Sequence, residues 1–173
     1  NRLKSIGIEE WIAEKKKTGA ICNIGFSFHG DTNTFKALID AYDWDFCQIQ
    51  YNYLDEHTQA GREGLHYAAD KEIPVVIMEP LRGGKLINAL PDGAKKAFAD
   101  HPVKRTPAAW AFHWLWNQPE VTCVLSGMNS EEMVQENINT ADNAKIDSFT
   151  ADDHRLIDTV RKEINRNLKV GCT

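Results

Sequence analysis

The chain has 173 residues, 42% of them hydrophobic and 26% charged, a balance that allows a globular protein to bury a sizeable core. A net charge of −5 excludes the basic surface that binding to nucleic acid requires. No apolar run approaches the roughly 20 residues that cross a bilayer and no signal peptide precedes the first helix, so we expect a cytoplasmic protein without a membrane partner.

The first part of the chain predicts a helix, a strand and a second helix. Residues 8–18 predict a helix that ends before Gly19, because glycine is common just after a helix. Residues 20–28 are largely apolar and predict a strand. Asp31 then caps a helix in which apolar residues recur at helical spacing. These recurring residues are Phe35, Leu38, Ile39 and Tyr42.

The next strand has a polar face. Residues 45–51 alternate with a period of two, which places Gln48 and Gln50 on one face of the strand and apolar residues on the other. Two amides on one face are unusual in a core. Residues 58–71 then predict a helix, although two glycines weaken that prediction.

A third strand leads into a glycine-rich loop. Residues 73–79 form a continuous apolar run, typical of a strand buried on both faces. Gly83 and Gly84 allow positive φ, so consecutive N–H groups can converge on an anion, while Arg82 and Lys85 supply positive charge. Gly-Gly pairs are also common in turns, so a phosphate-binding loop and a solvated turn both fit these residues.

The remainder of the chain predicts one strand and three helices. The segment after Lys85 is predicted to be irregular as far as Thr106-Pro107, a pair typical of a helix start. Residues 121–126 predict a short buried strand. Asn129 and Glu132 have the spacing of a capping box. The apolar face of the helix that they open comprises Val134, Ile138 and Ala141.

A terminal helix begins at Thr150, so that residues 150–173 form a helix that leads into a truncated tail. Because the chain begins at Asn1 without an initiator methionine, we expect residues 1–173 to be a single fragment of a longer protein. The strand-like runs also hold cysteines, which are expected to be small buried hydrophobes rather than members of a disulfide framework. They are Cys22, Cys47 and Cys123.

Strands that alternate with helices predict an α/β fold with a parallel sheet. Two architectures fit this order: an open doubly wound sheet, and half of a TIM (β/α)8 barrel, which in full takes about 250 residues. The half barrel requires the four strands to lie in sequential order, because each right-handed crossover returns the chain to the adjacent position. An open flavodoxin-like domain that binds a phosphate ligand would have a different order.

Four motifs together resemble those of the aldo-keto reductases, and they follow one another in the same order. They are Ile24–Gly30, Gln48–Asn52, Met78–Lys85, and Ser126–Ser130 with Glu136-Asn137. The resemblance implies barrel strands five to eight, the C-terminal half of the barrel. More narrowly, the chain is similar to a bacterial branch whose members often continue into a ferredoxin-like tail with a 4Fe-4S cluster, which Gly171-Cys172 would begin. Whether the parent protein carries that cluster stays open.

The resemblance also implies a cofactor, NADP or NAD, across the carboxyl ends of the strands and a small carbonyl substrate. Ser27 and Gln48 match the side chains that hold the nicotinamide carboxamide. The loop that matches the pyrophosphate site comprises Leu81, Arg82, Gly83, Gly84 and Lys85. Gly127 and Met128 lie in the loop after the last strand, and Glu136 and Asn137 match positions that meet the adenine.

Four positions depart from the family pattern. Phe28 stands where many relatives have a carboxamide-binding asparagine, and Met78 stands where many have an aromatic ring stacked on the nicotinamide. Glu79 replaces a small hydroxyl residue and is expected to bond to Arg82, to a strand-end partner or to the ribose. Met133 replaces a basic residue that many relatives use for the 2′-phosphate, so the choice between NADH and NADPH stays open.

The catalytic group of the family, formed by Tyr, Asp, Lys and His, lies on the first half of the barrel, so the resemblance implies no catalytic residue in this chain. His29, at a strand end, is a candidate to line the substrate pocket, and the histidines do not have metal-ligand spacing. The expected partner is the missing N-terminal half or a second copy paired through residues 20–28 and 121–126. A non-catalytic nucleotide-binding barrel is the alternative parent.

Overall fold

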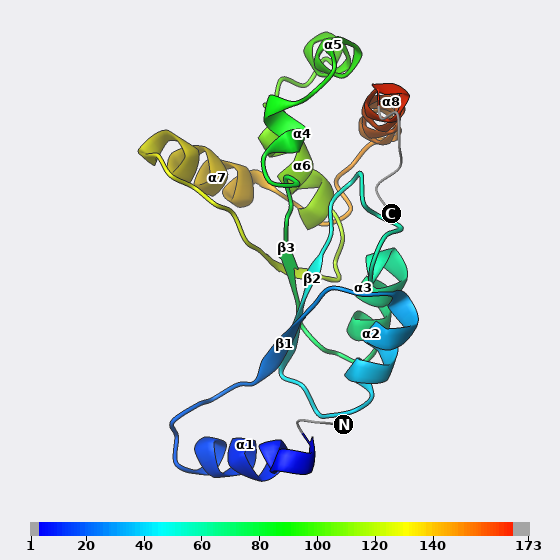
Figure 1. Ribbon diagram of the computed structural model, residues 1–173. Helices are drawn as coiled ribbons and strands as arrows, with labels where there is room; N and C mark the ends of the chain where they lie inside the picture. Colours follow the sequence, from blue (N-terminus) through cyan, green and yellow to red (C-terminus); the bar gives the residue numbers. More distant parts are fainter. Residues whose placement is uncertain (1–3, 168–173) are drawn as a thin grey trace.

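A computed structural model describes residues 4–167 of the chain (Figure 1). Along these residues, helices and strands alternate in the order η1 (Lys4–Ile6), α1 (Ile8–Lys17), β1 (Gly25–Phe28), α2 (Thr32–Ile39), β2 (Phe46–Gln50), α3 (Gly61–Asp70), β3 (Val75–Met78), α4 (Lys85–Asn88), α5 (Asp92–Asp100), α6 (Pro107–Trp116), β4 (Val121–Val124), α7 (Glu131–Asn143) and α8 (Ala151–Asn167).

The four strands form one parallel sheet in the order β1-β2-β3-β4. This sequential order confirms the predicted α/β fold, which is consistent with half of a TIM barrel followed by a C-terminal helix. It contradicts the flavodoxin-like alternative, which requires a different order. The strands are shorter than predicted: β1 begins at Gly25, which pairs with Phe46, the first residue of β2.

One face of the sheet carries the core. Side chains that alternate along the strands point toward the helices and are buried, among them Phe28, Cys47, Ile49, Val75 and Ile77. Helices α2 and α3 lie side by side on one flank of the strands (Figure 1) and add buried apolar residues to the same cluster. Burial of one large aliphatic side chain stabilises the fold by about 1.5–3 kcal/mol.

The opposite face of the sheet is open among the described residues. Ser27 is exposed, and Gln48, Gln50 and Met78 are half-buried. The period of two therefore places the amides of β2 opposite its buried residues, as the sequence predicts. The two faces of the same strands differ in composition, because only one of them packs against helices.

Two of the three described cysteines are not buried, in contrast to the prediction. Cys47 is buried on the helix-covered face, whereas Cys22 and Cys123 are exposed. Cys123 pairs with Val76 across a bulge between β3 and β4, which places it on the open face. Cys22 precedes β1, which begins at Gly25. An apolar neighbourhood in sequence thus did not indicate burial at these two positions.

The helix α7 does not pack as predicted. Val134 and Ile138 are 39% and 49% exposed and Ala141 is exposed, whereas Thr140 is the buried residue. Figure 1 shows α7 on the side of the strands opposite α2 and α3, where it contacts α6. Its cap is also one residue later than predicted, because Ser130 Oγ, not Asn129, accepts from the Met133 N–H at 3.3 Å.

The segment predicted to be irregular contains two helices, α4 and α5. Within α5, Ala94 and Phe98 are buried four residues apart, a helical spacing that the sequence prediction overlooked. Helix α5 packs against α8 at the end of the chain. The start of α8 is capped reciprocally, since the Thr150 N–H donates to Asp153 Oδ2 at 2.8 Å and the Asp153 N–H donates to Thr150 Oγ1 at 3.2 Å. Residues 168–173, which include the predicted tail, lie outside the described residues.

Candidate functional site

Three side chains meet on the open face of the sheet, each from a different strand. Ser27 faces Gln48 across the β1–β2 register, and Gln48 Nε2 donates to Ser27 Oγ at 3.2 Å. The same Nε2 lies 3.4 Å from Met78 Sδ on β3. A hydroxyl and a primary amide provide both donors and acceptors for a planar polar group. The structure thus brings together Ser27, Gln48 and Met78, which we call the open-face cluster.

The loop that follows β3, residues 79–85, has an unusual backbone. Four of its residues have positive φ: Glu79 (55°), Arg82 (51°), Gly83 (60°) and Gly84 (81°). Within the described residues, the N–H groups of Arg82 and Lys85 donate to carbonyls of the loop itself, at 3.1 Å each, whereas those of the two glycines donate to nothing. Two adjacent unpaired N–H groups in this conformation are what an anion site requires.

Two leucine side chains anchor residues 79–85, which we call the phosphate loop after the ligand that the sequence predicts for it. Leu81 packs against the core and Leu86, just after the loop, is fully buried. Lys85 is exposed at the start of the four-residue helix α4. The loop therefore has an apolar side that holds it to the sheet and a polar side that faces solvent.

The carboxylate partner of Arg82 is not the one that we expected first. Arg82 Nε lies 3.2 Å from Asp55 Oδ2, so Asp55, in the loop after β2, takes the place proposed for Glu79. Glu79 is exposed, and its Oε2 would lie 3.7 Å from a Cβ added at Gly83. A contact between Glu79 and a ribose stays a prediction.

Asp55 and Asn52 form a hydrogen-bonded group that the sequence prediction missed. Asn52 Nδ2 donates to Asp55 Oδ2 at 3.1 Å and to the Glu79 carbonyl at 3.0 Å. Its Oδ1 accepts from the N–H groups of Leu54 and Asp55 at 3.0 and 2.9 Å, which forms a local turn. The sequence feature that could have predicted this group was the Asn-x-x-Asp spacing just after a strand.

His29 is connected to this group through two glutamines. His29 Nδ1 lies 3.2 Å from Gln59 Oε1, and Gln59 Nε2 donates to Gln50 Oε1 at 3.2 Å. Gln50 Nε2 in turn lies 3.4 Å from Asp55 Oδ2. The predicted pocket residue therefore lies at the carboxyl ends of the strands, together with side chains that can exchange hydrogen bonds with a ligand.

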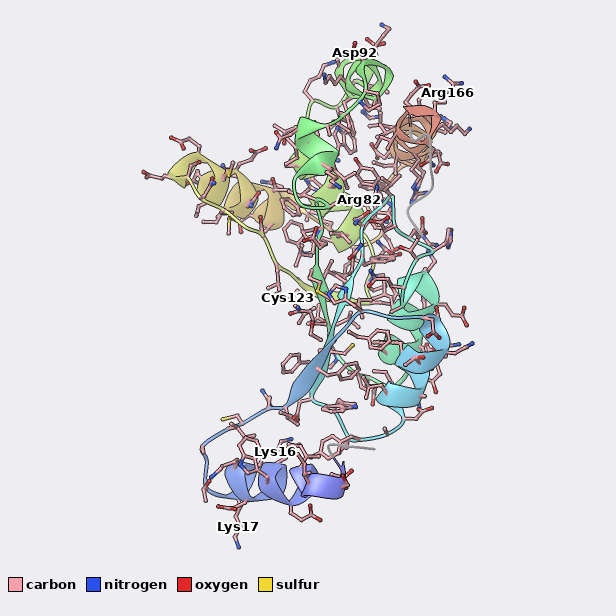
Figure 2. The ribbon with its side chains drawn as sticks, viewed as in Figure 1. Lys16, Lys17, Arg82, Asp92, Cys123 and Arg166 are labelled. Atoms are coloured by element: carbon pink, nitrogen blue, oxygen red, sulfur yellow. The ribbon has the colours of Figure 1, made fainter. Side chains whose placement is uncertain are left out.

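The remaining predicted residues lie beyond β4. Gly127 and Met128 are exposed. Asn137 Nδ2 donates to Ser126 Oγ at 3.0 Å, and the Glu136 carboxylate accepts from the hydroxyl of Thr106, the N-cap of α6. Figure 2 shows Arg82 beyond the strand ends, whereas Cys123 of β4 lies lower, beside the strands. The structure thus connects the residues of the first three strands directly and places those of the β4–α7 segment in a second group.

The two buried tyrosines in the described part of the chain are not poised to donate a proton to this site. Tyr51 and Tyr53 are buried on the helix-covered side, and desolvation raises the pKa of Tyr51 to about 12 and that of Tyr53 further. His113, inside α6, has its pKa lowered to about 4, first by desolvation and then by the charge of Arg105. Neither environment suits a proton donor at neutral pH.

Within residues 4–167, no group of His, Cys, Asp and Glu could hold a metal ion. In the same part of the chain, no helix has both the length and the apolar character that a membrane crossing demands.

Comparisons with known proteins give one family. The model of the aldo/keto reductase family matches residues 8–162. Among solved structures, aldo-keto reductase AKR11C1 from Bacillus halodurans matches in its holo form with a TM-score of 0.67 and in its apo form with 0.66, at 22% sequence identity in both cases. The alignments cover 86% of this chain but 53% and 54% of those chains, so the chain spans about half the length of these structures. A search among curated proteins gave no match.

Proposed function

Because the chain belongs to the aldo/keto reductase family, we propose that it is the C-terminal, cofactor-binding half of an oxidoreductase that reduces aldehydes or ketones with NADPH or NADH. When bound, the reduced nicotinamide supplies a hydride to the carbonyl carbon and is itself oxidised. The carbonyl oxygen then needs a proton from an acid, which we assign to the first half of the barrel.

The observation that carries this proposal is the arrangement of the open-face cluster beside the phosphate loop. Gln48 and Ser27 present donors and acceptors at the strand positions where the family holds the carboxamide. The unpaired N–H groups of Gly83 and Gly84 lie in the loop after the strand that carries Met78. In (β/α)8 enzymes phosphate commonly binds at the loops after strands seven and eight, which supports the same placement.

The rest of the cofactor site is proposed on sequence resemblance and position. We assign Glu136 and Asn137 to binding of the adenine. Gly127 and Met128 are assigned to the cofactor site from their place in the loop after β4. Glu136 now accepts from Thr106 and Asn137 donates to Ser126, so each would exchange a partner when adenine binds. His29 is assigned to the substrate pocket because it lies at the strand ends.

The open face also supports a proposal about the partner. Apolar side chains are exposed on the segment around β4 and α7, among them Leu125, Val134 and Ile138, and Trp11 is exposed near the opposite edge of the sheet. Uncovered strand edges beside apolar surface favour association. We propose that the first half of a barrel covers them, or in its absence a second copy. Sedimentation of this chain as a stable monomer at micromolar concentrations would contradict the pairing of two copies.

The test of cofactor binding uses two matched glycine substitutions in the full-length protein. Gly83→Ala and Gly19→Ala both place a side chain at positive φ, near 60° and 72°, but only Gly83 lies in the phosphate loop. Titration of NADPH and NADH, followed by cofactor fluorescence, should show weaker binding for Gly83→Ala and unchanged binding for Gly19→Ala. Equal binding by the two variants would contradict the assignment of the loop.

Activity is tested with an aromatic aldehyde. The full-length protein should oxidise the reduced cofactor, whereas the 173-residue chain alone should not, because loss of a positioned acid reduces the rate by roughly 10²–10⁴-fold. A full-length protein that binds the cofactor without turnover would favour the non-catalytic nucleotide-binding barrel.

A further inference from the structure

We infer that Asp55 is a positioning residue for the phosphate loop: its carboxylate holds Arg82 in the orientation that binds the cofactor's phosphates. This inference rests on the proposed function. It assigns a role to the loop after β2, none of whose residues is assigned a direct contact with the cofactor.

The first step is the arrangement of donors around Asp55. Its side chain is 9% exposed, and its Oδ2 lies 3.2 Å from Arg82 Nε, 3.1 Å from Asn52 Nδ2 and 3.4 Å from Gln50 Nε2. A carboxylate that receives several donors in a partly buried place has one orientation. Arg82, whose side chain is 21% exposed, is therefore held at its Nε by a rigid partner.

The second step is the backbone of the phosphate loop. Glu79 and Arg82 both have positive φ although neither is glycine, a conformation that side chains disfavour and that persists only where neighbours hold it. Asn52 Nδ2 donates to the Glu79 carbonyl at 3.0 Å and so holds the first of these residues. Asp55 holds the second through the Arg82 side chain. The same turn after β2 thus supports both unfavourable positions.

The third step concerns which nitrogens remain for a ligand. A guanidinium has donors on Nε and on two terminal nitrogens. The contact with Asp55 is made at Nε, and within the described residues the Arg82 side chain pairs with no other group. The terminal nitrogens are therefore the ones that can bind phosphate oxygens. Free rotation of the side chain is lost before the ligand arrives, which favours binding.

A positioning role and simple charge repulsion predict opposite changes in phosphate binding when the Asp55 charge is removed. An anion is repelled by a nearby carboxylate, so removal of the Asp55 charge should strengthen phosphate binding if only charge mattered. If Asp55 positions Arg82, its removal should instead weaken binding. Asp55→Asn in the full-length protein distinguishes the two, because it changes the charge and hardly the shape.

Glu56 provides the control, because it is the adjacent residue and is equally buried. Its carboxylate pairs with Arg62 and Arg161 on the helix side and does not contact the phosphate loop. Glu56→Gln should lower the denaturant midpoint of unfolding without changing affinity for NADPH. Asp55→Asn should weaken NADPH binding about tenfold, measured by fluorescence titration at fixed ionic strength.

A double mutant shows whether Asp55 acts through Arg82. If it does, Asp55→Asn combined with Arg82→Gln binds NADPH no more weakly than Arg82→Gln alone. A purely structural defect would add to the loss. The inference is overturned if Asp55→Asn binds as tightly as the wild type or more tightly, or if the two losses add.

Two further outcomes are informative. If Asp55→Asn does not fold, Asp55→Glu replaces it: this variant keeps the charge and displaces the carboxylate, so positioning predicts weaker binding and charge alone predicts no change. Wild-type affinity of Asp55→Glu overturns the inference. A wild-type protein that binds neither NADPH nor NADH contradicts the proposed function itself, a result distinct from equal binding by wild type and variant.

Discussion

Gln48 and Ile49 are neighbours in the chain and lie on opposite faces of the same strand. Ile49 is fully buried against the helices, whereas Gln48 is half-buried on the open face and donates to Ser27. One face of the sheet therefore contributes stability and the other presents polar groups. The difference shows that a strand only five residues long can present a buried apolar face and a polar face by alternation alone.

The largest effect is expected on the covered face. Ile49→Ala removes buried methyl groups from a fully packed position, and such substitutions cost about 2–5 kcal/mol in free energy of unfolding. Denaturant unfolding followed by tryptophan fluorescence measures the loss. A change below roughly 0.5 kcal/mol, typical of surface positions, would contradict the assignment of this face to the core.

A smaller effect of another kind is expected on the open face. Gln48→Ala should change stability little, but it should weaken NADPH binding about 2- to 10-fold, because a hydrogen bond contributes about 0.5–1.5 kcal/mol. Fluorescence titration measures the affinity, and Gln135→Ala on the exposed part of α7 is the control. If the two variants bound alike, Gln48 would have no role in binding.

The smallest effect is a difference in thiol reactivity between the two faces. Burial raises the pKa of Cys47 to about 12, whereas Cys123 is exposed on the open face. At pH 8 an alkylating reagent should modify Cys123 in the folded protein and Cys47 only after denaturation, with the sites assigned by mass spectrometry. Similar rates at both cysteines would show that the helices do not cover the sheet.

The raised pKa of Cys47 also predicts how the stability of the fold depends on pH. The Cys47 pKa is higher in the folded state than the ordinary value of 9.0, so the folded state binds this proton more tightly than the unfolded state. Its contribution to stability is complete below pH 9 and is lost as the pH rises toward 12. Cys47→Ala should flatten this part of the stability profile.

The phosphate loop marks the limit of what the sequence could predict about the site. Positive φ at Gly83 and Gly84 was expected from residue type, because glycine has no Cβ to oppose it. Positive φ at Glu79 and Arg82 was not expected, because it depends on support from Asn52 and Asp55. Local chemistry predicts the first kind of position, and a contact between distant segments determines the second.

Side-chain burial was predicted well inside the sheet and poorly at its edge. Alternation along β2 predicted correctly that Gln48 and Gln50 share the polar face, because the pleat fixes the direction of each side chain. On α7 the helical period placed Val134 and Ile138 on one face but could not show what that face meets. In the described residues Val134 and Ile138 stay exposed, at the rim of a shallow hollow that they share with Phe112 and Trp116 of α6.

The sequence by itself determined the alternation of strands and helices, several helix caps and the family motifs, because periodicity, capping and turn chemistry act over a few residues. Only the tertiary structure decided that Arg82 pairs with Asp55, that Cys123 is exposed on the open face and that α5 packs against α8. Each of these depends on strand register or helix docking between segments far apart in the chain. Such contacts are set by the packing of the whole sheet, and no local pattern records them.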